Sequence, residues 1–145
     1  MALTLDEIFT DITNDFKIDP TNLGGEALRT STGLFPKYIK EYSQCKLRVE
    51  LLENQKKNIL ASRRRYYSGD ATPEEYQKNP FNLKIKNESV MKQYLENDPD
   101  IVKADEKILI EQQKVEIFYG CLEEIKRRGY SIKVAVDMTK FEAGI

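Results

Sequence analysis

The chain has 145 residues and a formal net charge of −1; 32% of its residues are charged and 40% are apolar. Globular domains have about 25% charged and about 45–50% apolar residues, so this chain has less material for a core than is usual. That balance favours an elongated helical protein, or a core completed by other subunits, over a compact α/β enzyme. The sequence has no histidine and two cysteines, which excludes His-dependent nucleophilic catalysis, His-containing zinc sites and a disulfide framework.

The sequence carries no signal for a membrane or for export. No run of eighteen apolar residues occurs, and the first sixteen residues carry four acids rather than a basic segment. We therefore expect a cytoplasmic protein with no membrane partner, in which Cys45 and Cys121 are reduced, small apolar side chains.

The first 35 residues are expected to form the N-terminal helices. Thr4 and Glu7 match a capping box. The apolar residues that follow it share one helical face: Ile8, Phe9, Ile12 and Phe16. Pro20 is expected to end this helix, and the spacing then indicates a short, glycine-weakened helix over 21–30.

A long helix is predicted over 36–67, with Pro36 in the first turn, where proline is favoured. Its apolar seam repeats at alternating spacings of four and three residues, as in a coiled coil: Tyr38, Tyr42, Cys45, Val49 and Leu52. The same rhythm continues through cations: Lys56, Ile59, Arg63 and Tyr66. Residues 54–69 carry five bases and no acid, whereas 1–28 and 93–124 have net charges of −5 and −6.

Residues 68–97 are expected to form a loop and short helices. Thr72 and Glu75 give a second capping box, and Asn79-Pro80 ends the short helix that it opens. The lysine-rich segment 83–96 is expected to contain another short helix.

A second long helix is predicted over 98–129, with Asp98 as its N-cap and Pro99 at its first position. Gly129 is expected to end it after three cations that complement the helix dipole, Lys126, Arg127 and Arg128. The tail, 130–145, fits a helix over 131–141, which we favour because the rest of the chain is helical. Its alternating apolar residues also fit a strand.

These elements predict a single all-α domain over 1–145, built as a long antiparallel helical hairpin with short flanking helices. One hairpin cannot cover its apolar stripes on all sides, so we expect self-association into a ring-like homo-oligomer. We assign this role to apolar residues at the end of the second long helix and in the tail: Ile125, Ile132, Val136, Met138 and Phe141.

The basic run is the strongest candidate for a functional site. On a helix, Lys56, Arg63 and Tyr67 lie near one line, while Lys57 and Arg64 lie on a neighbouring one. Dense cations suit a phosphate backbone, and tyrosine rings offer faces on which unpaired bases stack. The candidate DNA-binding residues are therefore Lys56, Lys57, Arg63, Arg64, Arg65, Tyr66 and Tyr67. The alternative is a solvated face that pairs with the acidic 93–124 segment.

Other chemistry has little support. The sequence has no phosphate-binding glycine loop followed by Lys-Ser/Thr, so nucleotide hydrolysis of that type is not expected. The acids at 98–106 fit a helix cap and a solvated face better than a metal site. We therefore expect no catalytic residues, no metal and no cofactor.

Two separated motifs resemble one known family. Gln55-Lys56-Lys57, Arg63 and Tyr66–Gly69 resemble the UvsY recombination mediators of T4-type bacteriophages. The C-terminal pattern is more specific, with Ile125-Lys126, Arg128–Tyr130, Ile132-Lys133, Asp137-Met138 and Phe141–Gly144. Asp19, Thr21 and Leu23 also fit, so the resemblance spans nearly the whole chain.

The resemblance implies a helical, ring-forming homo-oligomer, expected to be a heptamer, in the cytoplasm of an infected bacterium. Such a protein binds single-stranded DNA coated by the phage single-strand-binding protein and weakens that protein's hold. It then helps the phage recombinase, UvsX, to load during homologous recombination and recombination-dependent replication and repair. The rival interpretation is a coiled-coil scaffold that binds no DNA.

The family's DNA-contacting motif places a Lys-x-Arg pair before the tyrosines. Here Arg63 matches the arginine, but Ala61 stands at the lysine position, and Arg64 and Arg65 replace a Leu-Asp pair. The resemblance therefore implies that the DNA contact is kept but moved by one or two positions.

Overall fold

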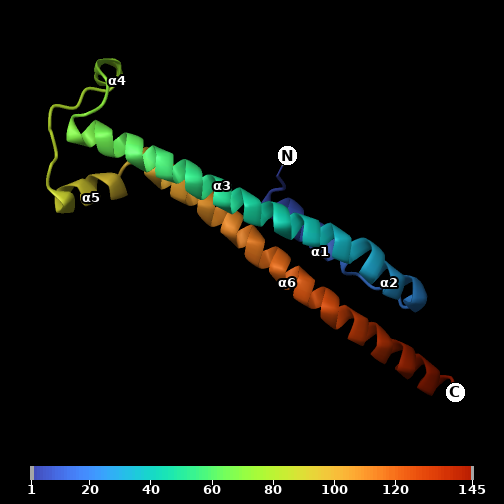
Figure 1. The fold of residues 1–145 in the computed structure, drawn as a ribbon. Coiled ribbons are helices and arrows are strands. Elements are labelled where there is room, and N and C mark those ends of the chain that lie inside the picture. Colours follow the sequence, from blue (N-terminus) through green and yellow to red (C-terminus); the bar gives the residue numbers. More distant parts are fainter. Residues whose placement is uncertain (1, 145) are drawn as a thin grey trace. The chain divides into compact units, whose positions relative to one another are not determined.

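The computed structural model describes residues 2–144, which form helices joined by short connections and contain no strand (Figure 1). The all-α prediction is confirmed. The elements are α1 (Leu5–Asp15), α2 (Leu23–Arg29), a π-helical turn η1 (Thr30–Leu34), α3 (Phe35–Ser68), α4 (Pro73–Lys78), α5 (Glu88–Glu96) and α6 (Pro99–Glu142). Within the described part of the chain, no helix has an apolar stretch long enough to cross a bilayer.

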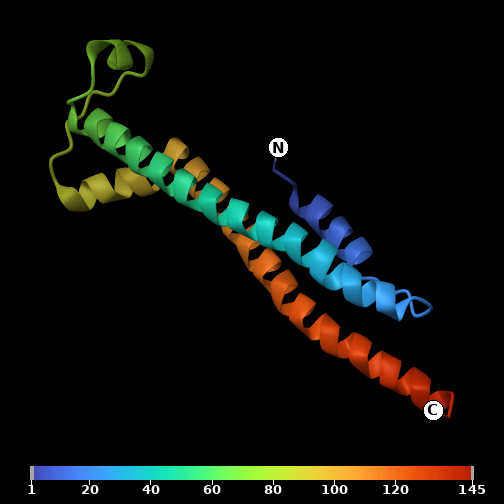
Figure 2. The same cartoon turned by 45° about the vertical axis from the view of Figure 1, so that its right-hand side comes forward.

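The chain, which we expected to form one domain, divides into two compact units. The first is the described part of Met1–Lys46 and Gln113–Ile145, and the second is Leu47–Gln112. The long helices α3 and α6 each contribute to both units (Figure 2). In the second unit these helices run antiparallel, because Lys56 pairs with Asp105 and the later Arg63 pairs with the earlier Asp98. In the first unit the order is the same, because Thr30, just before α3, bonds to Arg128 and the later Tyr38 packs on the earlier Phe118.

The first unit has an apolar core shared by α1, α3 and α6. Its buried members are Ile8, Leu34, Tyr38, Cys45, Phe118, Cys121 and Ile125. The capping box is confirmed: Glu7 N donates to Thr4 Oγ1 at 3.2 Å, and Thr4 N donates to Glu7 Oε2 at 2.9 Å. Helix α1 ends at Asp15, before Pro20, so the sequence placed its end too late.

Arg128 closes the first unit rather than stabilising the end of its own helix. Its side chain is 3% exposed and donates to Glu26 Oε2 at 2.5 Å and to Thr30 Oγ1 at 3.0 Å. It also donates to the carbonyl oxygens of Phe16 and Lys17, just after α1. The guanidinium thus satisfies carbonyls at a helix C-terminus, but the helix is α1 and not α6.

The prediction that Gly129 ends the second long helix is wrong. Helix α6 continues to Glu142 without a break, and Gly129 does not have a positive φ. A glycine inside a helix costs about 1 kcal/mol, which the next turn can offset by burying Ile132, 3% exposed. The preference for a helical tail is confirmed, and the strand alternative is excluded.

The second unit has a separate, largely aromatic core. Its buried members are Tyr66, Tyr67, Ile85, Met91, Leu95 and Ile101. Asp98 is the N-cap of α6, as predicted, and its Oδ1 accepts from the backbone nitrogens of Asp100 and Ile101 at 2.9 and 3.4 Å. Helix α5 begins at Glu88, so Lys84 and Lys86 lie in the irregular segment before it rather than in the short helix expected over 83–96.

Candidate nucleic-acid interface

The basic run divides between two faces of α3. Lys56 and Arg63 face α6, where Lys56 Nζ lies 2.6 Å from Asp105 Oδ1 and Arg63 Nε lies 2.7 Å from Asp98 Oδ2. Lys57 and Arg65 are exposed, and none of the ion pairs among the described residues includes either. The sequence alternative, pairing with the acidic 93–124 segment, therefore holds for the inner face of the run.

Arg63 contacts two tyrosine rings in addition to the Asp98 carboxylate. Its guanidinium lies 4.3 Å from the ring centroid of Tyr66 and 5.2 Å from that of Tyr67, in cation–π geometry. The Asp98 side chain is fully buried, and its Oδ2 also accepts from the Tyr67 hydroxyl at 2.5 Å. Burial alone would raise the pKa of Asp98, but the hydrogen bonds from Tyr67 and Arg63 outweigh it and lower that pKa below 3.8.

The tyrosines belong to the core of the second unit. Tyr66 and Tyr67 are 7% and 8% exposed. The Tyr66 ring stacks on Tyr76 at 5.5 Å, and the Tyr67 ring lies 5.4 Å from Tyr94. The prediction that these two rings stack on DNA bases is therefore not supported by this conformation, because protein side chains already occupy their faces. Two adjacent tyrosines at the end of a helix anchor its connection to α4 and α5.

Three cations of the run remain on the outer surface: Lys57, Arg64 and Arg65. Arg64 Nη1 lies 2.8 Å from Glu88 Oε1, but both side chains are well exposed, at 46% and 79%. Exposed pairs of this kind contribute only about 0–1 kcal/mol, so a phosphate can compete for Arg64. Arg63, by contrast, would have to leave a buried carboxylate, which is costly.

Two lysines that we did not assign to the site lie beside the end of α3. Lys86 Nζ donates to Ser68 O at 2.9 Å, and Ile85 N donates to Tyr67 O at 3.0 Å. Gly69 has φ +87°, and a Cβ added there would lie 2.8 Å from Lys84 Cγ, so Lys84 packs directly against the turn. Both lysines are exposed, but Lys86 Nζ also lies 3.9 Å from Asp70 Oδ2, so Lys84 is the one that adds unpaired positive charge to this surface. The sequence shows that this segment is rich in lysine, but not that it folds back onto the helix.

The residues assigned to self-association lie in different environments. Ile125 and Ile132 are buried within the chain, at 7% and 3% exposed, and Ile125 belongs to the core of the first unit. Val136 is half-buried, whereas Met138 and Phe141 are exposed at 53% and 80%. Met138 and Phe141 are therefore the members of this set that a second copy could contact.

The remaining titratable groups to consider are the acids and the two cysteines. In the described residues, no three of the His, Cys, Asp and Glu side chains are grouped so as to hold a metal ion. Both cysteines are buried thiols, as expected, and burial raises the pKa of Cys121 to about 11. A thiol with that pKa is a poor nucleophile at neutral pH.

Exposed cations gathered at one end of a pair of long helices are typical of helical proteins that bind polyanions. Residues 11–145 match the family model described as "Recombination, repair and ssDNA binding protein UvsY". The chain is 32% identical over 142 residues to the recombination protein uvsY of Enterobacteria phage T4, covering 98% of this chain and 99% of that one. It therefore belongs to the UvsY family of recombination, repair and single-stranded-DNA-binding proteins.

Solved structures agree with this assignment. One crystal structure of the bacteriophage T4 recombination mediator protein UvsY matches 98% of this chain with a TM-score of 0.83 and 31% identity, covering 99% of that chain. A second lattice form matches 97% of this chain with a TM-score of 0.81 and 29% identity, also covering 99% of that chain. The resemblance predicted from the two sequence motifs is confirmed, and so is the helical fold that it implied.

Proposed function

We propose that this protein is a recombination mediator that binds single-stranded DNA through the outer face of the α3 end. It weakens the hold of the phage single-strand-binding protein on that DNA and promotes loading of the phage recombinase, UvsX. The observation that carries the proposal is the group of exposed cations, Lys57, Arg64 and Arg65, in a member of the UvsY family. No chemical step is needed, since differential affinity for two conformations of the strand is sufficient to shift a population.

One copy of this surface offers few phosphate contacts, so it binds weakly. The binding is also sensitive to salt, because each phosphate contact on a single strand contributes a slope of about −0.7 to log K against log salt. A ring of copies converts weak contacts into avidity, since every contact after the first is effectively intramolecular. We propose that the chain acts as a ring-like homo-oligomer, a heptamer, with Met138 and Phe141 in contacts between copies. Truncating the chain after Gly129 is then expected to disperse the oligomer in sedimentation velocity. Because α6 continues through Gly129, the sharper variant is Met138→Ser with Phe141→Ser, which exposes no buried group.

The test of DNA binding is a titration of a fluorescent oligothymidylate at several salt concentrations. Arg64→Ala with Arg65→Ala is expected to weaken binding and to flatten the salt slope by about 1.4, for two lost phosphate contacts. Arg63→Ala with Arg64→Ala is also expected to lower affinity, with the Arg64 contact responsible for the change in slope. An unchanged slope in both double variants would exclude the outer face as the phosphate contact.

A mediator assay separates this proposal from the scaffold alternative. Strand exchange by the recombinase on DNA coated with the single-strand-binding protein is expected to depend on this protein, and to fail with the Arg64/Arg65 variant. A scaffold that binds no DNA would fail to bind the oligonucleotide even at low salt. Sedimentation with and without the oligonucleotide at two salt concentrations reports assembly and DNA binding in one experiment.

A further inference from the structure

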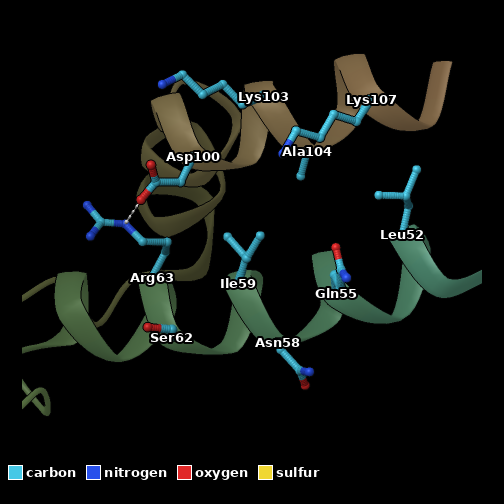
Figure 3. Close-up of a pocket in the computed structure, with 10 residues that line it drawn as sticks. All are labelled: Leu52, Gln55, Asn58, Ile59, Ser62, Arg63, Asp100, Lys103, Ala104 and Lys107. Atoms are coloured by element: carbon cyan, nitrogen blue, oxygen red, sulfur yellow. Dashed lines mark ion pairs between the residues drawn. The ribbon is translucent and has the colours of Figure 1, made fainter. Parts of the chain in front are cut away.

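Two grooves flank the α3–α6 pair in the second unit, and they differ in charge. The first has a volume of about 480 Å³ and includes Arg63, Asp100, Lys103 and Lys107 in its walls (Figure 3). The second has a volume of about 550 Å³ and lies on the side of α5. A phosphate backbone that reaches the end of α3 can follow one side of the helix or the other, so the charge of each groove decides its path.

The charged side chains that line the groove on the α5 side cancel one another. Its three cations each have an acid within reach: Lys56 with Asp105 at 2.6 Å, Arg64 with Glu88 at 2.8 Å, and Lys92 with Glu96 at 3.9 Å. Three positive and three negative side chains leave no net charge. A strand entering this groove would meet carboxylates as often as cations, and the repulsion would cancel the attraction.

The groove in Figure 3 has an excess of positive charge. Lys103 and Lys107 are exposed and one helical turn apart on α6, and no ion pair among residues 2–144 includes either of them. The one acid in its walls is Asp100, whose Oδ2 lies 4.0 Å from Arg63 Nε. Because Asp98 already holds Arg63 at 2.7 Å, Asp100 is a secondary partner, and the two lysines remain uncompensated.

The opposite wall suits a nucleotide in a different way. Gln55, Asn58 and Ser62 of α3 line it with amide and hydroxyl groups, and Leu52, Ile59 and Ala104 supply apolar surface. Asn58, Ser62 and Arg65 are spaced four and three residues apart, so they form one stripe on α3. That stripe connects the outer basic face to this groove.

We propose that this groove is a second part of the DNA site, in which Lys103 and Lys107 bind backbone phosphates of single-stranded DNA. The strand passes from Arg65 along the Asn58–Ser62 stripe into the groove, with the polar wall facing sugars or base edges and the apolar surface facing a base. The inference rests on the proposed function and adds a route for the strand. Beyond the outer face, where a phosphate competes with Glu88 for Arg64, the strand enters the groove that contains Lys103 and Lys107 and not the groove on the α5 side.

The experiment compares two double variants of equal charge. Lys103→Gln with Lys107→Gln removes the unpaired cations of the groove, and Lys78→Gln with Lys92→Gln removes two exposed lysines outside it. With a slope of about 0.7 per contact, each contact strengthens binding about fivefold when salt falls from 1 M to 0.1 M, so losing one contact weakens binding at 0.1 M by about that factor. The Lys103/Lys107 variant is therefore expected to bind an oligothymidylate about 25-fold more weakly, with a salt slope reduced by about 1.4. The Lys78/Lys92 control is expected to keep the wild-type slope.

A gain-of-function variant gives a second, independent readout. Asp100→Asn removes the one carboxylate of the groove and is expected to tighten binding by up to about fivefold, the value of one cation. Damage to the fold cannot produce tighter binding. Equal losses in the lysine variant and its control, or unchanged affinity in both Asp100→Asn and the groove lysine variant, would overturn this route. If the wild-type protein binds no oligonucleotide, the proposed function fails as well.

Discussion

The buried carboxylate of Asp98 is expected to be the most important polar side chain for the stability of the second unit. Its Oδ1 caps α6, and its Oδ2 accepts from both Arg63 Nε and the Tyr67 hydroxyl, at 2.7 and 2.5 Å. Asp98→Ala removes the cap and leaves a partly buried guanidinium and a buried hydroxyl without their acceptor. Breaking a buried ion pair costs about 3–5 kcal/mol. The Arg63 side chain is 22% exposed and can reach water, so we expect the lower end, about 3 kcal/mol.

The assay is urea unfolding followed by circular dichroism and by tyrosine fluorescence, because the second core contains several tyrosines and the chain has no tryptophan. Asp98→Asn keeps an oxygen to cap α6 and removes only the charge, so it is expected to cost about 1 kcal/mol less than Asp98→Ala. Adding Arg63→Met to Asp98→Ala removes the orphaned cation and is expected to cost less than the sum of the single changes. A free energy of unfolding for Asp98→Ala within about 0.5 kcal/mol of wild type would refute the reasoning.

The same group predicts a pH dependence. The folded-state pKa of Asp98 lies below 3.8, so the folded state favours the charged form more than the unfolded state does. The stabilisation that the Asp98 carboxylate gives the folded state is fully present above about pH 5, and it is lost as pH falls through the folded-state pKa. The stabilities of wild type and Asp98→Asn are therefore expected to differ by a constant amount above about pH 5 and to converge in acid.

Four further predictions concern the remaining structure. Arg128→Ala is expected to cost about 3 kcal/mol, measured by thermal or urea unfolding, because it breaks a buried ion pair; we expect the lower end of the range since Arg29 still pairs with Glu26 at 3.2 Å, and a loss below about 1 kcal/mol would contradict that role. Gly129→Ala is expected to stabilise the protein by about 0.5–1 kcal/mol, since an added Cβ meets nothing within 4 Å and φ is not positive. Gly69→Ala is expected to destabilise the protein, because φ is +87° and the added Cβ would meet the side chain of Lys84. Cys45 and Cys121 are expected to resist a thiol reagent at pH 8 until urea unfolds the chain, and fast labelling of the native protein would show that the first core opens readily.

Local signals in the sequence were sufficient for most helix boundaries. The capping box at Thr4, the N-cap at Asp98 and the extent of the long helix near 36–67 follow from residues within a few positions of each boundary, and the structure contains all three. Capping depends on hydrogen bonds between near neighbours, so a short stretch of sequence contains the information. Gly129 shows the limit of such signals, because burial of Ile132 in the next turn offsets the local cost of the glycine.

The sequence by itself determined that five cations and two tyrosines lie together near the end of one long helix, and two motifs placed the chain in its family. It could not determine which of these side chains a polyanion can reach. That depends on tertiary contacts: Arg63 and Tyr67 are held by Asp98, some thirty residues away, while Arg65 stays exposed and Lys84 and Lys86 come to lie beside Gly69 and Ser68 at the end of α3. The physical reason is that helical periodicity fixes the direction of each side chain relative to its neighbours, whereas the packing of α6 and of the loop decides which directions lead to solvent.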